Sequence, residues 1–205
     1  MHGHWLNDLF YNFDDSIFKA TYNLEQNIPW LAKFAKFISW FGNSPAPLLL
    51  LLAVVLCVFR KTRKKGIVVT LAILFEVLLV NLVLKNVISR PRLFWDESNP
   101  YYHMWVYAQG TYHTSYSFPS GHTAIATAIG VGLFLTCNKK YSWSFLLFPL
   151  LMGWSRIAIF VLYPSDVLVS LIIVSLTTVG AYYLSYKVLF KIKFVENLIY
   201  GEKLF

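Results

Sequence analysis

Three short segments of the chain contain side chains that could bind and cleave a phosphate ester. Lys85 and Arg92 follow an apolar run, the sequence PSGH at 119–122 begins another, and Arg156 comes shortly before Asp166. A helix that begins within PSGH would present free backbone N–H groups, which bind anions. The histidine of this sequence, His122, could give or take a proton near neutral pH. The three segments therefore predict an anion site with a proton donor beside it.

The cations of these segments lie close to apolar runs, where an unpaired charge costs at least about 2.5–3.5 kcal/mol on insertion scales. Arginine binds phosphoryl oxygens in a bidentate manner and lysine adds a point charge, so Lys85, Arg92 and Arg156 together favour a phosphoryl ligand. Clamping those oxygens would also stabilise phosphoryl transfer. Two alternatives remain open: each cation extends to the membrane surface on its own, and PSGH is an ordinary capped helix start.

The composition indicates that lipid surrounds the helices that must position these side chains. Of the 205 residues, 57% are hydrophobic and 14% are charged, and the mean hydropathy is +0.54. A soluble domain has about half apolar and a quarter charged residues, and a span needs about 20 apolar residues. This length predicts spans near 44–59, 66–88, 119–137, 142–161 and 164–186.

Two N-terminal segments are less clearly assigned. Residues 28–42 contain two lysines and form either a short first span or a helix lying in the interface. Residues 5–24 predict an amphipathic helix that precedes the spans. Its apolar side chains are Trp5, Leu9, Phe10, Phe13, Ile17 and Phe18.

The basic residues of the connections predict the orientation. RKTRKK at 60–65, NKK at 138–140 and the lysines at 187, 191 and 193 fall on one side if the spans alternate. Short basic connections stay in the cytoplasm. The net charge of +8 therefore reflects membrane topology and does not indicate nucleic-acid binding. The loop 89–118 and the connection 161–166 then lie on the outer side, together with the three segments that carry the chemistry.

In order and spacing, these segments resemble the three-part motif of the PAP2 family, the type 2 phosphatidic acid phosphatases. The resemblance covers roughly residues 85–166 and implies one all-α membrane domain over 1–205, a six-helix transmembrane bundle with 28–42 as its first span. It implies hydrolysis of a lipid phosphate such as undecaprenyl diphosphate, without metal or cofactor, at the outer face of a bacterial cytoplasmic membrane. By the family pattern, His122 protonates the leaving oxygen. The implied phosphate-binding residues are Lys85, Arg92, Ser120, Gly121 and Arg156.

Two positions depart from the family pattern. Leu93 follows Arg92 where the family has proline, and the alternative pair Arg90-Pro91 is two residues too close to Lys85. The family's nucleophilic histidine falls at Leu162, which can neither attack phosphorus nor accept a hydrogen bond. Asp166, which orients that histidine in the family, would then have no imidazole to hold. We expect the chain to bind phosphate and to turn over very slowly or not at all.

Three explanations of Leu162 are open. The chain is a variant of a working enzyme, a natural pseudo-enzyme that binds lipid phosphates, or an enzyme in which His103 or His113 replaces the lost group. The first agrees best with the survival of every other motif residue, and the third is the weakest because a loop histidine rarely replaces one at a helix start. A transporter, suggested by the intramembrane Glu76, is a further alternative. The aromatic loop 94–118 either covers the site or forms an interfacial belt.

Overall fold

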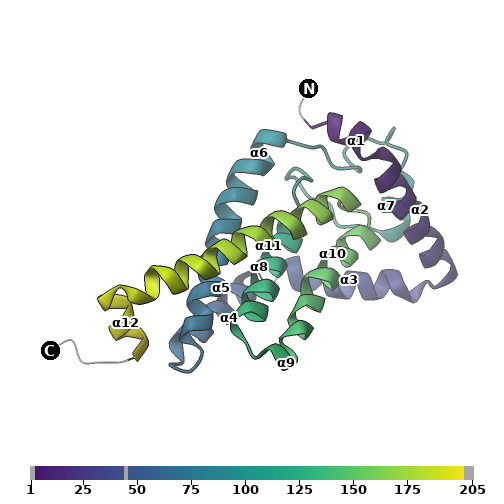
Figure 1. Cartoon of the computed structure of the whole chain (residues 1–205). Helices are drawn as coiled ribbons and strands as arrows, with labels where there is room; N and C mark the ends of the chain where they lie inside the picture. Colours follow the sequence, from purple (N-terminus) through teal and green to yellow (C-terminus); the bar gives the residue numbers. More distant parts are fainter. Residues whose placement is uncertain (1–2, 44–45, 201–205) are drawn as a thin grey trace.

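The structure, a computed structural model, describes residues 3–43 and 46–200 and is helical throughout, with no strand in these two ranges (Figure 1). The all-α prediction is confirmed for this part of the chain. The helices are α1 (Trp5–Leu9), α2 (Tyr11–Asn27), α3 (Trp30–Asn43), α4 (Ala46–Val58), α5 (Arg63–Glu76), the π-helix η1 (Val77–Leu84), α6 (Lys85–Ile88), α7 (Tyr102–Ala108), α8 (Gly121–Thr136), α9 (Lys139–Ser142), the 3₁₀ turn η2 (Trp143–Leu146), α10 (Leu147–Ala158), α11 (Pro164–Lys187), the 3₁₀ turn η3 (Leu189–Lys191) and α12 (Lys193–Tyr200).

Two helices are long and apolar enough to cross a membrane. The continuous helix Arg63–Ile88, made of α5, η1 and α6, has 26 residues, and Pro164–Lys191 has 28. At about 1.5 Å per residue, both exceed the roughly 30 Å of a bilayer core. Their most apolar windows are only 33% and 28% buried, so most of this apolar surface faces outward, as lipid contact requires. They match the spans predicted at 66–88 and 164–186.

The other predicted spans correspond to shorter helices. Residues 119–137 contain α8, 142–161 contain η2 and α10, and 28–42 overlap α3. Of the predicted span 44–59, α4 covers Ala46–Val58, and 44–45 lie outside the described residues. The central helix α8 packs against α5, α10 and α11. Gly130 makes the contact with η2 possible, because a Cβ atom there would lie 2.7 Å from the carbonyl oxygen of Phe145. Helix length alone does not establish six spans, so that number stays a prediction.

The segment 5–24, predicted as one helix, forms two helices, α1 and α2, that meet at Phe10, and its apolar side chains do not all face the interior. The side chains of Trp5 and Leu9 are 56% and 64% exposed, whereas Phe18 is fully buried. The buried face of α2 includes two acids, Asp14 and Glu25. This helix therefore contributes polar groups to the interior and leaves much of its apolar surface for the membrane interface.

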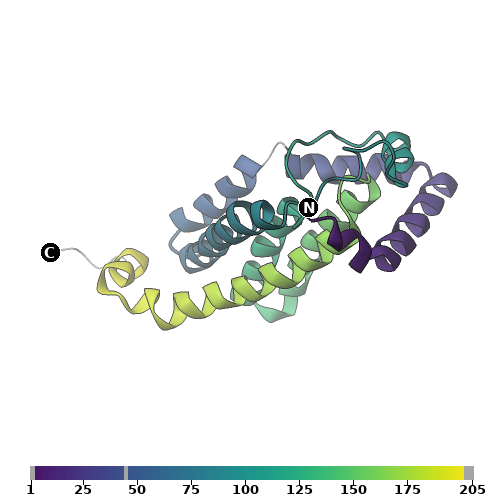
Figure 2. The same cartoon turned by 90° about the horizontal axis from the view of Figure 1, so that it is seen from above.

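The short helices and the connections between the long helices lie in two separate regions of the molecule. Figure 1 shows α1, α2, α6 and α7 in the upper part of the molecule, and the α4–α5 connection, α9 and α12 in the lower part. The lower region holds the three basic clusters. Viewed from above, the long α11 and the shorter α3 lie on opposite sides of the molecule (Figure 2).

Candidate active site

The PSGH segment forms the start of α8. Ser120 is the N-cap residue, and its hydroxyl oxygen accepts a hydrogen bond from the Thr123 backbone N–H at 3.3 Å and donates one to the Thr123 hydroxyl at 2.8 Å. Ser120 is fully buried, so the structure gives its hydroxyl a helix-capping role. Pro119 precedes the N-cap, because α8 begins at Gly121.

Gly121 lies against the end of the long helix Arg63–Ile88. A Cβ atom at Gly121 would lie 3.0 Å from the Oδ1 atom of Asn81 and 3.6 Å from the Nζ atom of Lys85. The absence of a side chain at Gly121 therefore brings the α8 N-terminus close to the lysine ammonium group. The Asn81 amide donates to the Glu76 carboxylate at 2.9 Å, and their spacing of five residues fits the i→i+5 periodicity of the π-helix that follows Glu76.

Arg92 is buried and tied to the outer loop. Its Nε donates to the Ser115 carbonyl oxygen at 2.6 Å, and its Nη1 donates to the Val161 carbonyl oxygen at 2.9 Å. Burial lowers the pKa of Arg92 to about 10, which leaves it charged at neutral pH. The guanidinium thus joins the loop 89–118 to the connection that follows α10.

Arg156 projects from the last turn of α10 and contacts two distant segments. Its Nη1 donates to the Ser39 hydroxyl of α3 at 2.5 Å, and its Nη2 lies 2.8 Å from Nε2 of His113. Arg156 is fully buried. The arrangement joins α3, α10 and the outer loop at one cation.

His113 is the point at which the predicted site residues meet. Its ring centroid lies 6.0 Å from that of His122, in an edge-on arrangement. Burial, followed by the positive charges of Arg156, Arg92 and Lys85, lowers the pKa of His113 from 6.5 to about 3. Of the three predicted phosphate-binding cations, Arg156 contacts this imidazole directly, and Arg92 and Lys85 act on it through their charge. The other loop histidine, His103, lies against Tyr22 of α2 instead.

Asp166 has a different partner from the one the motif suggested. Its Oδ1 lies 2.6 Å from Nη1 of Arg90, and its Oδ2 accepts a hydrogen bond from the Tyr163 backbone N–H at 3.1 Å. The Asp166 carboxylate thus binds a guanidinium and a backbone N–H in place of the imidazole that the motif assigns to it. Burial by itself lowers the pKa of Arg90, but Asp166 and Asp14 raise it above its ordinary value.

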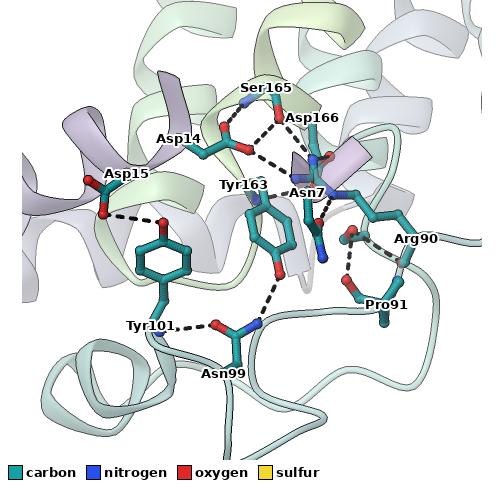
Figure 3. Close-up of polar contacts among 11 residues, drawn as sticks. Asn7, Asp14, Asp15, Arg90, Pro91, Asn99, Tyr101, Tyr163, Ser165 and Asp166 are labelled. Atoms are coloured by element: carbon teal, nitrogen blue, oxygen red, sulfur yellow. Dashed lines mark hydrogen bonds and ion pairs between the residues drawn. The ribbon is translucent and has the colours of Figure 1, made fainter. Parts of the chain in front are cut away.

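Figure 3 shows that Arg90 is surrounded by acceptors from three segments. Its Nη2 pairs with Asp14 of α2 at 2.9 Å, its Nη1 donates to the Ser165 hydroxyl at 2.8 Å, and its Nε donates to Asn7. Asp14 also accepts a hydrogen bond from the Ser165 backbone N–H at 2.7 Å. No sequence pattern indicated this network, because Asp14 belongs to an amphipathic helix distant from every motif.

Leu162, which the motif spacing predicts to take the place of the nucleophile, is 2% exposed and belongs to an apolar cluster. The outer loop supplies much of that cluster, including Phe94, which stacks on Trp105 at 4.8 Å between ring centroids. The aromatic loop thus packs over the segment that follows α10. The other buried members of the cluster are Phe18, Ala35, Leu93, Tyr101, Met104, Ala108, Ala158, Ile159, Phe160, Val161 and Tyr163.

Comparison with known families resolves the lineage. Residues 47–190 match the family model described as the PAP2 superfamily. The chain belongs to the PAP2 superfamily. This PAP2 match extends over all three motif segments and over α4–α11, so it covers the helices that position the site.

Curated relatives carry a phosphatase name. The chain is 31% identical to the undecaprenyl-diphosphatase BcrC of Bacillus subtilis over 157 residues, 77% of this chain and 76% of that protein. It is also 31% identical to an undecaprenyl-diphosphatase of Sulfolobus acidocaldarius over 140 residues, 68% of this chain and 60% of that protein. This PAP2 protein is thus of phosphatase lineage.

Solved PAP2 structures share the fold. The transmembrane PAP2-type phosphatidylglycerolphosphate phosphatase of Bacillus subtilis aligns with a TM-score of 0.66 at 24% identity, over 88% of each chain. The LpxE protein of Aquifex aeolicus aligns with a TM-score of 0.64 at 27% identity, over 81% of this chain and 92% of its own. Together with the two long apolar helices, these likenesses support a membrane location.

Proposed function

We propose that this PAP2 protein binds a lipid phosphate or diphosphate and removes the terminal phosphate at the outer face of the membrane. The observation that carries the proposal is the convergence of Lys85, Arg92 and Arg156 on His113, beside His122. Three cations match the charge of a phosphoryl group, whose oxygens accept from arginine in a bidentate manner. The names of the two curated relatives favour undecaprenyl diphosphate as the substrate.

The site residues take the following roles in this proposal. The guanidinium groups of Arg92 and Arg156 and the ammonium of Lys85 bind the phosphoryl oxygens, helped by the Gly121 backbone N–H at the start of α8. Ser120 holds that helix start in place through its hydrogen bonds with Thr123. A bound phosphoryl anion favours the charged form of the neighbouring His122, which then donates a proton to the leaving oxygen.

Leu162 supports a second candidate function, a binding protein for lipid phosphates without turnover. The family's attacking imidazole is missing, and Asp166 is occupied by Arg90. Because leucine cannot attack phosphorus, we still predict low or absent turnover through position 162. A transporter is less well supported, because the intramembrane carboxylate of Glu76 accepts a hydrogen bond from Asn81 of the same continuous helix.

We further propose six spans, with α3 as the first, and the site on the side opposite the three basic clusters. The support is that α4–α5, α9 and α12 lie in one region of the molecule and the outer loop in another (Figure 1). Short basic connections remain in the cytoplasm. In a bacterium, this orientation directs the site away from the cytoplasm.

The test is phosphate release from undecaprenyl diphosphate, phosphatidylglycerol phosphate and phosphatidic acid by the chain and by Leu162→His. Vanadate binding to both proteins is measured in parallel. We expect vanadate to bind both, and Arg156→Ala to weaken that binding by at least about tenfold, the loss of one charge-assisted contact. Tight vanadate binding that survives Arg156→Ala would contradict the anion site. No release from any lipid by Leu162→His would favour the binding protein over the phosphatase.

A further inference from the structure

The segment after α10 has lost the group that would attack phosphorus. Leu162 is packed in the apolar cluster beneath the outer loop, and both carboxylate oxygens of Asp166 already have partners in Arg90 and the Tyr163 backbone. A nucleophile for this pocket must therefore come from another segment. His113 is a candidate, because its imidazole contacts Arg156 and lies beside His122.

The hydrogen bond with Arg156 fixes the tautomer of His113. A guanidinium group only donates hydrogen bonds, so Nε2 of His113, 2.8 Å from Nη2 of Arg156, must be the acceptor. The ring proton of the neutral imidazole is then on Nδ1. The Nε2 lone pair is directed at the guanidinium that would bind the phosphoryl oxygens, and the lowered pKa of His113 keeps this nitrogen unprotonated.

His113 also has the partner that phosphoryl transfer requires. His122 lies with its ring centroid 6.0 Å away, so one imidazole can attack while the other protonates the leaving oxygen. In the free protein, Nε2 occupies an acceptor position next to Arg156. A phosphoryl oxygen bound by Arg156 would take over this position and bring the phosphorus next to the Nε2 lone pair.

The loop holds His113 in a defined place. The Trp95 indole Nε1 donates to the His113 carbonyl oxygen at 2.9 Å, and Arg92 binds the carbonyl oxygen of Ser115 two residues later at 2.6 Å. Thr111 adds a contact between its hydroxyl and Nε2 at 3.0 Å. These anchors supply the positioning that a histidine in an unsupported loop would lack.

We propose that His113 is the nucleophile of this chain, a role that rests on the phosphatase function proposed above. The Nε2 lone pair forms a bond to the terminal phosphorus of a lipid diphosphate as the bond from that phosphorus to the bridging oxygen breaks. The electron pair of the broken bond stays on the bridging oxygen, which takes a proton from protonated His122 and leaves as lipid monophosphate.

The second step regenerates both histidines. Neutral His122 takes a proton from a water molecule, whose oxygen attacks the phosphorus of the phosphohistidine. The phosphorus–nitrogen bond breaks, its electron pair returns to Nε2 of His113, and inorganic phosphate leaves. Leu162 is compatible with turnover in this scheme, because the attack comes from the outer loop and not from the segment after α10.

The test uses the full chain in detergent micelles with farnesyl diphosphate as the probe and inorganic phosphate as the product. The parent, His113→Gln, Leu162→His and the double variant are compared, with His103→Gln as the matched loop control. We expect the parent to release phosphate and His113→Gln to lose at least about 100-fold of the rate, as for loss of a nucleophile. His103→Gln should stay within about twofold of the parent, as is usual for surface substitutions.

The double variant separates attack from positioning. If His113 attacks, Leu162→His restores release in the His113→Gln background, since it supplies the family's nucleophile. An equal loss from His113→Gln in both backgrounds would show that His113 only shapes the pocket, and this result would overturn the proposal. Release by Leu162→His together with none by the parent would also overturn it, while leaving the proposed phosphatase function intact.

Trapping of the intermediate gives an independent readout. The parent is quenched in alkali during turnover of farnesyl diphosphate labelled in its terminal phosphate, and the label is mapped to a peptide. We expect an alkali-stable, acid-labile label on His113. Label on another residue would exclude His113 as the nucleophile. Absence of phosphate release and of vanadate binding in every chain, Leu162→His included, would count against the proposed function itself.

Discussion

Arg90 holds Asp166 in this protein: Nη1 lies 2.6 Å from Oδ1, and both side chains are fully buried. The guanidinium of Arg90 also stacks over the ring of Tyr163 at 3.7 Å and pairs with Asp14 of the N-terminal helix. The aspartate that the motif assigns to a catalytic imidazole is here part of a buried ionic network. This network fastens α2 to the start of α11, next to the proposed site.

Removal of Arg90 should destabilise the fold. Arg90→Gln leaves the carboxylates of Asp14 and Asp166 buried without their cation, and breaking a buried pair in this way costs about 3–5 kcal/mol. We expect the unfolding temperature in detergent to fall by about 10 °C. The control is Lys19→Ala, which removes the pair with Asp15, a pair whose lysine is 64% exposed. A shift for Arg90→Gln no larger than for this surface pair would contradict the role of the network.

Gly121→Ala should weaken phosphate binding with little loss of stability. A Cβ atom would lie 3.0 Å from Asn81 Oδ1 and 3.6 Å from Lys85 Nζ, so Asn81 must move by a few tenths of an ångström and the space beside Lys85 narrows. We expect vanadate affinity to fall by about tenfold, which corresponds to roughly 1.4 kcal/mol. Gly180→Ala is the matched control, since nothing lies within 4 Å of its Cβ position. Unchanged affinity in Gly121→Ala would remove Gly121 from the site.

Trp95→Phe tests whether the anchor of His113 matters. The substitution keeps an aromatic ring but loses the indole N–H that donates to the His113 carbonyl oxygen at 2.9 Å. We expect kcat for farnesyl diphosphate to fall by about tenfold, since misplacement of a reacting group by about 1 Å can cost up to about 100-fold. Trp105→Phe is the control, because the Trp105 indole N–H has no hydrogen-bond partner among the described residues. An equal loss of kcat in both variants would show that packing of the ring, and not the hydrogen bond, determines the rate.

Glu25 predicts an unusual dependence of stability on pH. This carboxyl is 1% exposed, with no hydrogen-bond partner in the described part of the chain, and burial raises its pKa from 4.5 to about 7. The folded state therefore binds its proton more tightly than the unfolded state does. The resulting contribution to stability is complete below about pH 4.5 and is lost as the pH rises through about 7.

The measurement is the unfolding temperature of the parent and of Glu25→Gln between pH 4.5 and 8. Glutamine cannot ionise, so we expect this variant to keep its unfolding temperature at pH 8, where the parent falls about 5–10 °C below it. Near pH 4.5 the two proteins should be similar. A variant that is less stable than the parent at pH 8 would show that the ionised Glu25 has a favourable partner.

The sequence by itself determined the helical class, the two long spans and the order of the three motif segments. Each of these depends on local properties of the chain, namely runs of apolar residues, a capped helix start and residues at fixed spacings. The choice of Arg92 over Arg90 also rested on spacing alone. That choice stays a prediction; in the structure the charge of Arg92 acts on His113, whereas Arg90 pairs with Asp14 and Asp166.

Only the tertiary structure decided what His113 and Asp166 contact. His113 lies 43 residues from Arg156, and Asp14 lies 76 from Arg90, so no local pattern relates the members of either pair. Folding of the outer loop brings the imidazole to the cations, and packing of α2 brings the carboxylate of Asp14 to Arg90. A buried charge must find a partner of opposite sign or a hydrogen-bonding group, and the partner it finds depends on which segments the fold places side by side.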